Sequence, residues 1–219
     1  MAVRDSTSGA SRDAPTVRVL GAASIRVEPD EAFVWLTLTA LDSSAGEALR
    51  DVAARNTALA RLLDAADVPR TDRSSGGITV GEQVDHTQHG MRPLGQRATA
   101  TTVVRLVDSE QIGAVIVRAT TELDARVQGP SWRVSPSNPA WLRAATLAAT
   151  VARDKAAAYA AGVGARLGRL VSLSEPSEHF APQGLRMARA AGGGDLHVDA
   201  GEHEVAATVW AEFELGSEP

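Results

Sequence analysis

The chain has 219 residues, a hydrophobic content of 44% and a formal net charge of -5. This length and apolar content predict a folded globular protein, and the acidic balance lacks the broad positive surface with which proteins bind nucleic acid. Cysteine is absent, which excludes disulfides, thiolate metal sites and thiol nucleophiles.

Residues 1–15 are mostly small, polar and charged, and they contain no apolar run typical of a signal peptide. Such a segment cannot bury enough apolar surface to fold, so we expect a disordered tail. No later run approaches the roughly 18 apolar residues that a membrane helix needs. The sequence therefore predicts a cytoplasmic protein without membrane insertion.

Strand-forming residues dominate the chain up to residue 41. Three strands are expected before the first helix: two short ones within 17–27 and, after a turn at 28–31, a buried strand over 32–41 that is apolar on both faces. Ser44 and Glu47 have the spacing of a capping box, which predicts that an amphipathic helix begins there and covers 44–66.

The middle of the chain predicts a hairpin followed by a second helix. Two strand-like runs, 78–84 and 97–107, flank a polar loop that contains Gly90 and Pro93. Asp108 is expected to cap a shorter helix, and a further strand is expected at 123–134.

Pro139 begins the third and longest predicted helix, which ends at Gly162. Its expected core-facing side is mainly alanine: Trp141, Leu142, Ala145, Ala149, Ala152, Ala156 and Tyr159. A strand over 167–173 should follow, then a long flexible loop at 176–202, and finally an alternating, half-buried strand over 205–215. The predicted fold class is α+β, a largely antiparallel sheet with three helices mainly on one face, in a single domain over 16–216.

Three segments, in this order and spacing, resemble the SIMPL domain family. They are Val19-Leu20-Gly21 with Val27-Glu28-Pro29-Asp30, the alanine-rich stretch from Ala156 to Leu170, and the closing strand from Val205 to Leu215. The resemblance covers Val17 to Leu215 and implies a non-enzymatic homo-oligomer linked to the cell envelope or to oxidative stress in bacteria. Many relatives look exported, whereas this sequence shows no signal peptide, and the family supplies no catalytic motif.

Histidines are the candidate metal ligands. His86 and His89 lie on the hairpin loop, and His197 and His203 lie in or beside the long loop. Solvated polar side chains are the simpler interpretation, so no metal, cofactor or catalytic residue is expected. A metal-dependent protein or enzyme built on these loops is the alternative.

The glycine-rich stretch 162–168 follows a helix, whereas a phosphate-binding loop precedes one. It therefore predicts a helix end with a left-handed Gly162 and no nucleotide site.

Large aromatic side chains are the candidates for an interface. Trp210 lies on the outward side of the closing strand, and Trp141 and Tyr159 lie on the third helix. We expect a homo-oligomer that assembles through sheet edges and the alanine-faced helix. The sequence is also compatible with a second, unidentified protein partner.

Overall fold

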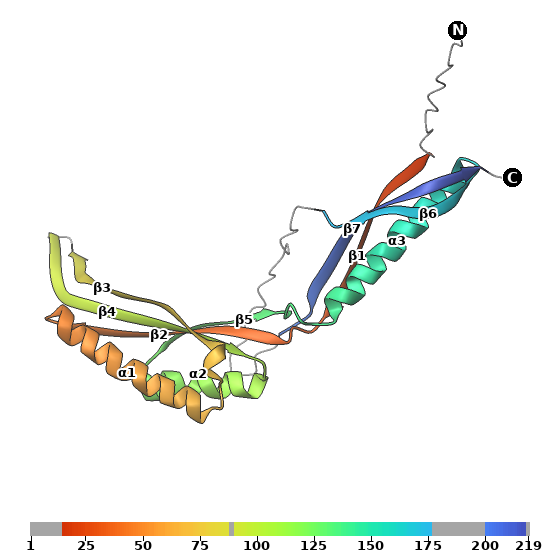
Figure 1. Cartoon of the computed structure of the whole chain (residues 1–219). Coiled ribbons are helices and arrows are strands. Elements are labelled where there is room, and N and C mark those ends of the chain that lie inside the picture. Colours follow the sequence, from red (N-terminus) through yellow and green to blue (C-terminus); the bar gives the residue numbers. More distant parts are fainter. Residues whose placement is uncertain (1–14, 88–89, 177–199, 218–219) are drawn as a thin grey trace, which may run out of the picture. The chain divides into compact units, whose positions relative to one another are not determined.

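The computed structural model describes residues 15–87, 90–176 and 200–217 (Figure 1). Its elements are β1 (Thr16–Val27), β2 (Glu31–Asp42), α1 (Ala45–Ala65), the short 3-10 helix η1 (Arg70–Asp72), β3 (Arg73–Thr87), β4 (Gly90–Leu106), α2 (Ser109–Leu123), β5 (Arg126–Arg133), α3 (Ala140–Gly162), β6 (Ala165–Ser174) and β7 (His203–Ser217). The α+β class is confirmed. The predicted tail 1–15 and loop 176–202 lie outside the described residues except for their end residues.

The strands form two sheets where the sequence predicted one. One sheet has the order β1-β7-β6 and the other has the order β3-β4-β2-β5. A single continuous β1 replaces the two short strands expected within 17–27. The chain accordingly divides into two compact units, a first with β1, α3, β6 and β7, and a second with β2 through β5. The division describes compactness alone, and the single domain over 16–216 stays a prediction.

The second unit has the order β-α-β-β-α-β, which is a split β-α-β arrangement of the ferredoxin-like type. Its two helices lie on one face of the sheet (Figure 1). Between the helices and the sheet lies a core built from β2, α1, β4 and α2, with Ala125 before β5. Its buried members are Ala32, Val34, Leu36, Leu38, Leu59, Leu62, Leu63, Val68, Val104, Leu106, Ile112, Val115, Ala119 and Ala125.

The central strand β2 is apolar on both faces, as predicted, but only one face is fully buried. Val34, Leu36 and Leu38 are completely covered on the helix side. Phe33 and Trp35 point to the opposite face and stay half-buried, because no helix of this unit lies there. The expectation of a strand buried on both faces is therefore wrong in this respect.

Local capping places the helices of the second unit. The Ser44 hydroxyl accepts a hydrogen bond from the Glu47 backbone N–H, which confirms the predicted start of α1. The reciprocal half of the capping box is replaced, because the Ser44 N–H donates to the Asp42 carboxylate. This backbone hydrogen bond, helped by the Ser43 hydroxyl, lowers the pKa of Asp42. The Asp108 carboxylate caps α2 as predicted.

In the first unit, α3 packs on the sheet through its smallest side chains. The buried residues are alanines four apart: Ala140, Ala144, Ala148, Ala152, Ala156 and Ala160. The alanine-rich core face is confirmed, but its predicted membership is wrong for Trp141, Leu142 and Tyr159, which are exposed. Large side chains are excluded from this face because β1 lies too close to the helix.

Gly21 is the point at which β1 and α3 come closest. A Cβ atom at this position would lie 2.1 Å from the Ala148 carbonyl oxygen and 2.7 Å from the Ala152 Cβ. Next to it, the Lys155 ammonium group donates a 2.9 Å hydrogen bond to the Leu20 carbonyl. The Gly21 backbone and the alanine stripe therefore form one close-packed seam.

The end of α3 has the left-handed glycine that the sequence predicts, but at a different residue. α3 continues through Gly162, and the left-handed residue is Gly164, with a φ of 68°. Glycine adopts this conformation without the steric cost that a Cβ atom brings.

Replacing Gly21 with alanine should destabilise the protein strongly. The new methyl group collides with backbone atoms of α3, so we expect unfolding free energy to fall by about 3 kcal/mol, the upper end of overpacking costs. Gly46→Ala is the matched control, since its added Cβ meets nothing within 4 Å on α1. Helix propensity predicts a gain of about 0.5–1 kcal/mol there. Urea unfolding of both variants measures the contrast, and equal stabilities would contradict the seam.

Candidate functional site

The edge strand β3 is the least covered strand of the second unit. It pairs with β4 in an uninterrupted antiparallel register from Gly77 to Gln83, and its other edge is not paired with any strand of the described chain. Ile78 is 62% exposed and Val80 is 43% exposed. Both side chains lie on the helix side of the sheet, because their partners across the ladder are Ala100 and Ala98 of the core face.

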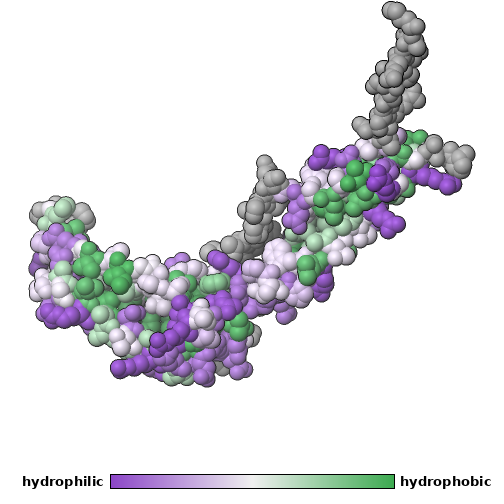
Figure 2. Space-filling model, viewed as in Figure 1, coloured by the Kyte–Doolittle hydropathy of each residue, from purple (hydrophilic) through white to green (hydrophobic). Residues whose placement is uncertain are grey.

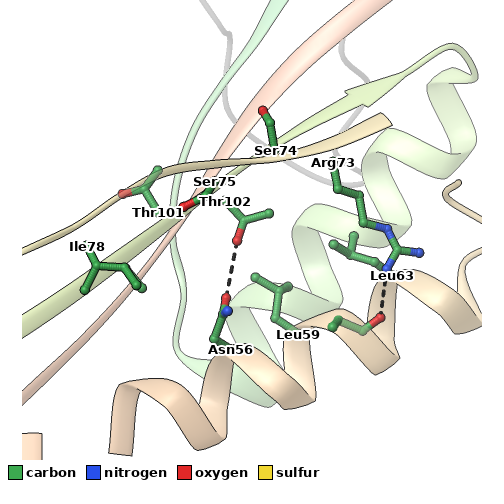
Figure 3. A pocket seen from close by; sticks show the side chains of 11 residues that line it. Asn56, Leu59, Leu63, Arg73, Ser74, Ser75, Ile78, Thr101 and Thr102 are labelled. Carbon is green, nitrogen blue, oxygen red and sulfur yellow. Dashed lines mark hydrogen bonds between the residues drawn. The ribbon is translucent and has the colours of Figure 1, made fainter. Parts of the chain in front are cut away.

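A groove runs between β3 and α1 because α1 packs mainly on β4 and β2. Its volume is about 220 Å³. It is lined by Asn56, Leu59, Ala60 and Leu63 from α1 and by Arg73, Ser74, Ser75, Ile78, Ala100, Thr101 and Thr102 from β3 and β4. Figure 3 shows Ile78 and Leu59 on opposite sides of this space.

Several polar groups of the groove bond to one another or to the backbone, whereas the buried Arg73 Nε has no hydrogen-bond partner among the described residues. The Thr102 hydroxyl donates to the Asn56 side-chain oxygen at 3.3 Å. Arg73 reaches from β3 to α1, where it donates to the Ala60 carbonyl and forms a 2.8 Å ion pair with Asp64. The arginine charge is thus balanced within the unit.

Size and polarity together indicate what the groove accommodates. Pockets for organic ligands usually measure about 300–1,000 Å³, so a 220 Å³ groove is small for a cofactor. The leucine and isoleucine side chains in its lining suit apolar side chains of another polypeptide. Sequence reasoning missed this surface, although an uncharged, proline-free run from Ser74 to Gly81 was the available signal.

Arg105 is the centre of an ionic cluster in the second unit, where it forms ion pairs with two carboxylates. It lies on β4, with its guanidinium 2.7 Å from Asp72 and 3.3 Å from the nearly buried Glu31. The hydrogen bond with Asp72 raises the pKa of Arg105 above its usual value. Because all three charges are paired, we interpret the cluster as a structural tie between η1, β2 and β4.

Arg105→Gln should therefore lower the unfolding free energy. Removing the arginine leaves the Glu31 carboxylate without its partner, and we expect a loss of about 1–3 kcal/mol. Arg118→Gln is the matched control, because its pair with Glu122 is exposed on both sides and should matter by less than about 0.5 kcal/mol. Thermal and urea unfolding check the difference, and a neutral Arg105 variant would contradict the structural interpretation.

The interface candidates from the sequence all lie in the first unit. Tyr159 is 61% exposed and Trp141 is 37% exposed on α3. Trp210 is half-buried on β7, where the Arg18 guanidinium lies 4.9 Å from the centre of its ring. The indole predicted to lack any cover is thus partly covered by its own unit.

Further apolar side chains surround these candidates. On α3, Leu142 is 75% exposed and Leu147 is 46% exposed, and the edge strand β6 exposes Leu170 and Leu173. Figure 2 shows hydrophobic surface along α3. Sequence reasoning missed the two β6 leucines, which two irregularities in the β6–β7 register bring to the α3 side of the sheet.

The histidine candidates are not brought together by the described residues. His86 lies in β3 opposite Met91, and His203 begins β7. His89 and His197 lie outside the described residues. Within residues 15–87, 90–176 and 200–217, no three histidine, aspartate or glutamate side chains converge as a metal site would require. In the same residues, no helix is long and apolar enough to cross a membrane.

Comparison with known proteins decides the family. The family model described as "SIMPL: Protein of unknown function (DUF541)" matches residues 17–213. The chain belongs to the SIMPL family. This match confirms the resemblance seen in the sequence and covers every helix and almost all of the strands of both units. A comparison with curated proteins gives no match.

Solved structures give only distant similarity to this SIMPL chain. A hydantoinase/carbamoylase family amidase from Burkholderia ambifaria is 18% identical, with 57% of this chain and 34% of that chain covered and a TM-score of 0.25. A putative amidohydrolase/peptidase from Burkholderia cenocepacia is 19% identical, with coverages of 66% and 36% and a TM-score of 0.26. The chain thus spans about a third of the length of these proteins. Similarity at this level assigns no activity.

Proposed function

We propose that this SIMPL protein acts by assembling with copies of itself and by binding a protein partner, without catalysing a reaction. The observation that carries the proposal is the outer surface of α3, where Leu142 is 75% exposed and Tyr159 is 61% exposed. Large apolar and aromatic side chains that stay exposed on a helix are typical of protein interfaces.

The geometry also changes which part of α3 is available for assembly. The alanine stripe is buried against β1 within the same unit, so it offers no surface to another copy. The interface candidates Trp141 and Tyr159 lie outside this stripe and are exposed. Assembly would therefore use the large side chains of α3, with Trp210 and the β6 leucines as further candidates.

The family resemblance implies a role in the cell envelope or in oxidative stress. A protein scaffold that binds partners is compatible with such a role. Symmetric homo-oligomers present repeated copies of one surface to a partner. The alternative of a metal-dependent protein gains no support, since no described residues assemble the histidines into a ligand set.

Light scattering at micromolar concentration tests the assembly. We expect a defined oligomer for the unmodified protein and a shift toward smaller species for Leu142→Glu and Tyr159→Glu, because each buries a charge in the proposed contact. Circular dichroism should show an unchanged fold, since both side chains are exposed.

Ala157→Glu is the matched control on the same helix, at an exposed position that offers only a methyl group. It adds the same charge and should leave the oligomer intact. An unmodified protein that is monomeric throughout the micromolar range would overturn the proposed self-assembly.

A further inference from the structure

We infer that the free edge of β3 pairs with β3 of a second copy, antiparallel and about a two-fold axis at Thr79. The two four-stranded sheets of the second unit would then join into one sheet of eight strands. The inference deepens the proposed self-assembly and rests on it. It assigns a contact that lies in the second unit, separate from the α3 surface of the first.

The backbone of β3 supplies the first argument. Each strand has two hydrogen-bonding edges, and β4 occupies one edge of β3 from Arg73 to Thr87. An open edge offers a row of N–H and C=O groups to any other strand. Natural sheets protect such edges with proline, charged side chains or bulges, and the stretch from Gly77 to Gly81 has neither proline nor charge and pairs in a regular register.

The other outer strand of the same sheet is protected, which makes the contrast informative. β5 contains Pro130, which has no N–H to donate, and its register with β2 is interrupted between Phe33 and Trp35. Arg126 and Arg133 add charge at its two ends. β3 also has charges and irregularities toward its ends, but between them Gly77–Gly81 is regular, uncharged and free of proline, and β5 has no stretch of this length with these properties.

Side-chain pairing supplies the second argument, because β3 is complementary to itself about Thr79. Antiparallel pairing about this residue places Ile78 opposite Val80 of the second copy, and Val80 opposite its Ile78. All four side chains fall on the helix side of the joined sheet, since Ile78 and Val80 share that side. Two residues now 62% and 43% exposed would cover each other.

Neighbouring registers pair these side chains less completely. An axis at Ile78 would place Val80 opposite Gly76, which has no side chain and lies in the irregularity between Ser75 and Gly77. An axis at Val80 would place Ile78 opposite the Glu82 carboxylate of the second copy, and an axis at Gly81 would place Val80 there. Both would desolvate a charge against an apolar side chain. With the axis at Thr79, Gly77 lies opposite Gly81, so no side chains collide at the flanks.

The groove beside α1 is also compatible with β3 of a second copy at this edge. Ile78 forms part of its wall, with Leu59 and Leu63 on the helix side. Val80 of the second copy would lie next to Ile78 and extend this wall with another apolar side chain. A β-strand added to a sheet edge commonly gains affinity from the backbone and specificity from such side-chain contacts.

Disulfide trapping tests the register directly, because the natural chain has no cysteine. Residues opposite each other in an antiparallel pair have Cα atoms about 4.5–5.5 Å apart, which lies within the range of a disulfide. Thr79→Cys should therefore form a covalent dimer under mild oxidation. Gln83→Cys is the control, since its two copies would lie about 26 Å apart along the strands and should not cross-link.

A charge on the edge gives an independent readout in solution. Val80→Lys removes both apolar cross-strand pairs and should weaken this contact about tenfold, as measured by sedimentation over a concentration series. Thr79→Ser is a conservative control at the axis and should leave the affinity unchanged. Covalent trapping of Gln83→Cys but not of Thr79→Cys would overturn the register.

The outcomes separate this inference from the broader proposal. If Leu142→Glu dissociates the oligomer while Thr79→Cys gives no covalent dimer and Val80→Lys has no effect, the β3 contact is wrong and the proposed function stands. If Thr79→Cys cross-links and the α3 variants change nothing, the β3 edge is the assembly contact. A monomeric unmodified protein that gives no cross-link refutes both.

Discussion

Helices cover one face of each sheet in this protein, and most properties of its surface follow from that one-sided packing. In the second unit, Val34, Leu36 and Leu38 are completely buried against α1 and α2, whereas the alternate side chains of the same strand are only half-buried. Because side chains of a strand alternate between faces, every strand that adds to the core also adds to an uncovered face. The chain therefore exposes more apolar surface than a sheet covered on both faces would.

Coverage is also incomplete across the sheet, and the edge strand shows it most clearly. α1 lies over β4 and β2, so the helix side of β3 is left open along Ile78 and Val80. The part of this edge from Gly77 to Gly81 has neither charge nor proline, and such a stretch is a hazard for aggregation unless another strand occupies it. The proposed pairing of two copies would turn this exposure into a specific contact, and it would account for the absence of charge between Gly77 and Gly81.

Local signals were readable in the sequence, and long-range ones were not. Ser44 and Asp108 announce the starts of α1 and α2 because a cap depends on residues two or three positions away. The phase of α3 was misjudged because its partner, Gly21, lies more than 100 residues away in the chain and leaves no trace in the helix. The exposed edge was missed for the same reason, since the order β3-β4-β2-β5 is a property of the whole unit. Trp141 and Tyr159 could be proposed as interface candidates from their residue type, whereas the β3 edge required the structure.

Each unit has its own kind of internal packing, and this sets which substitutions it tolerates. The first unit joins α3 to β1 through alanines and Gly21, which have almost nothing to lose by truncation and no room for enlargement. The second unit is filled by leucine, isoleucine and valine, which leave cavities when they are shortened. Substitutions that add atoms should accumulate least along the α3 seam, and substitutions that remove atoms should accumulate least around β2. Among members of the family, we therefore expect the first unit to resist larger side chains and the second unit to resist smaller ones.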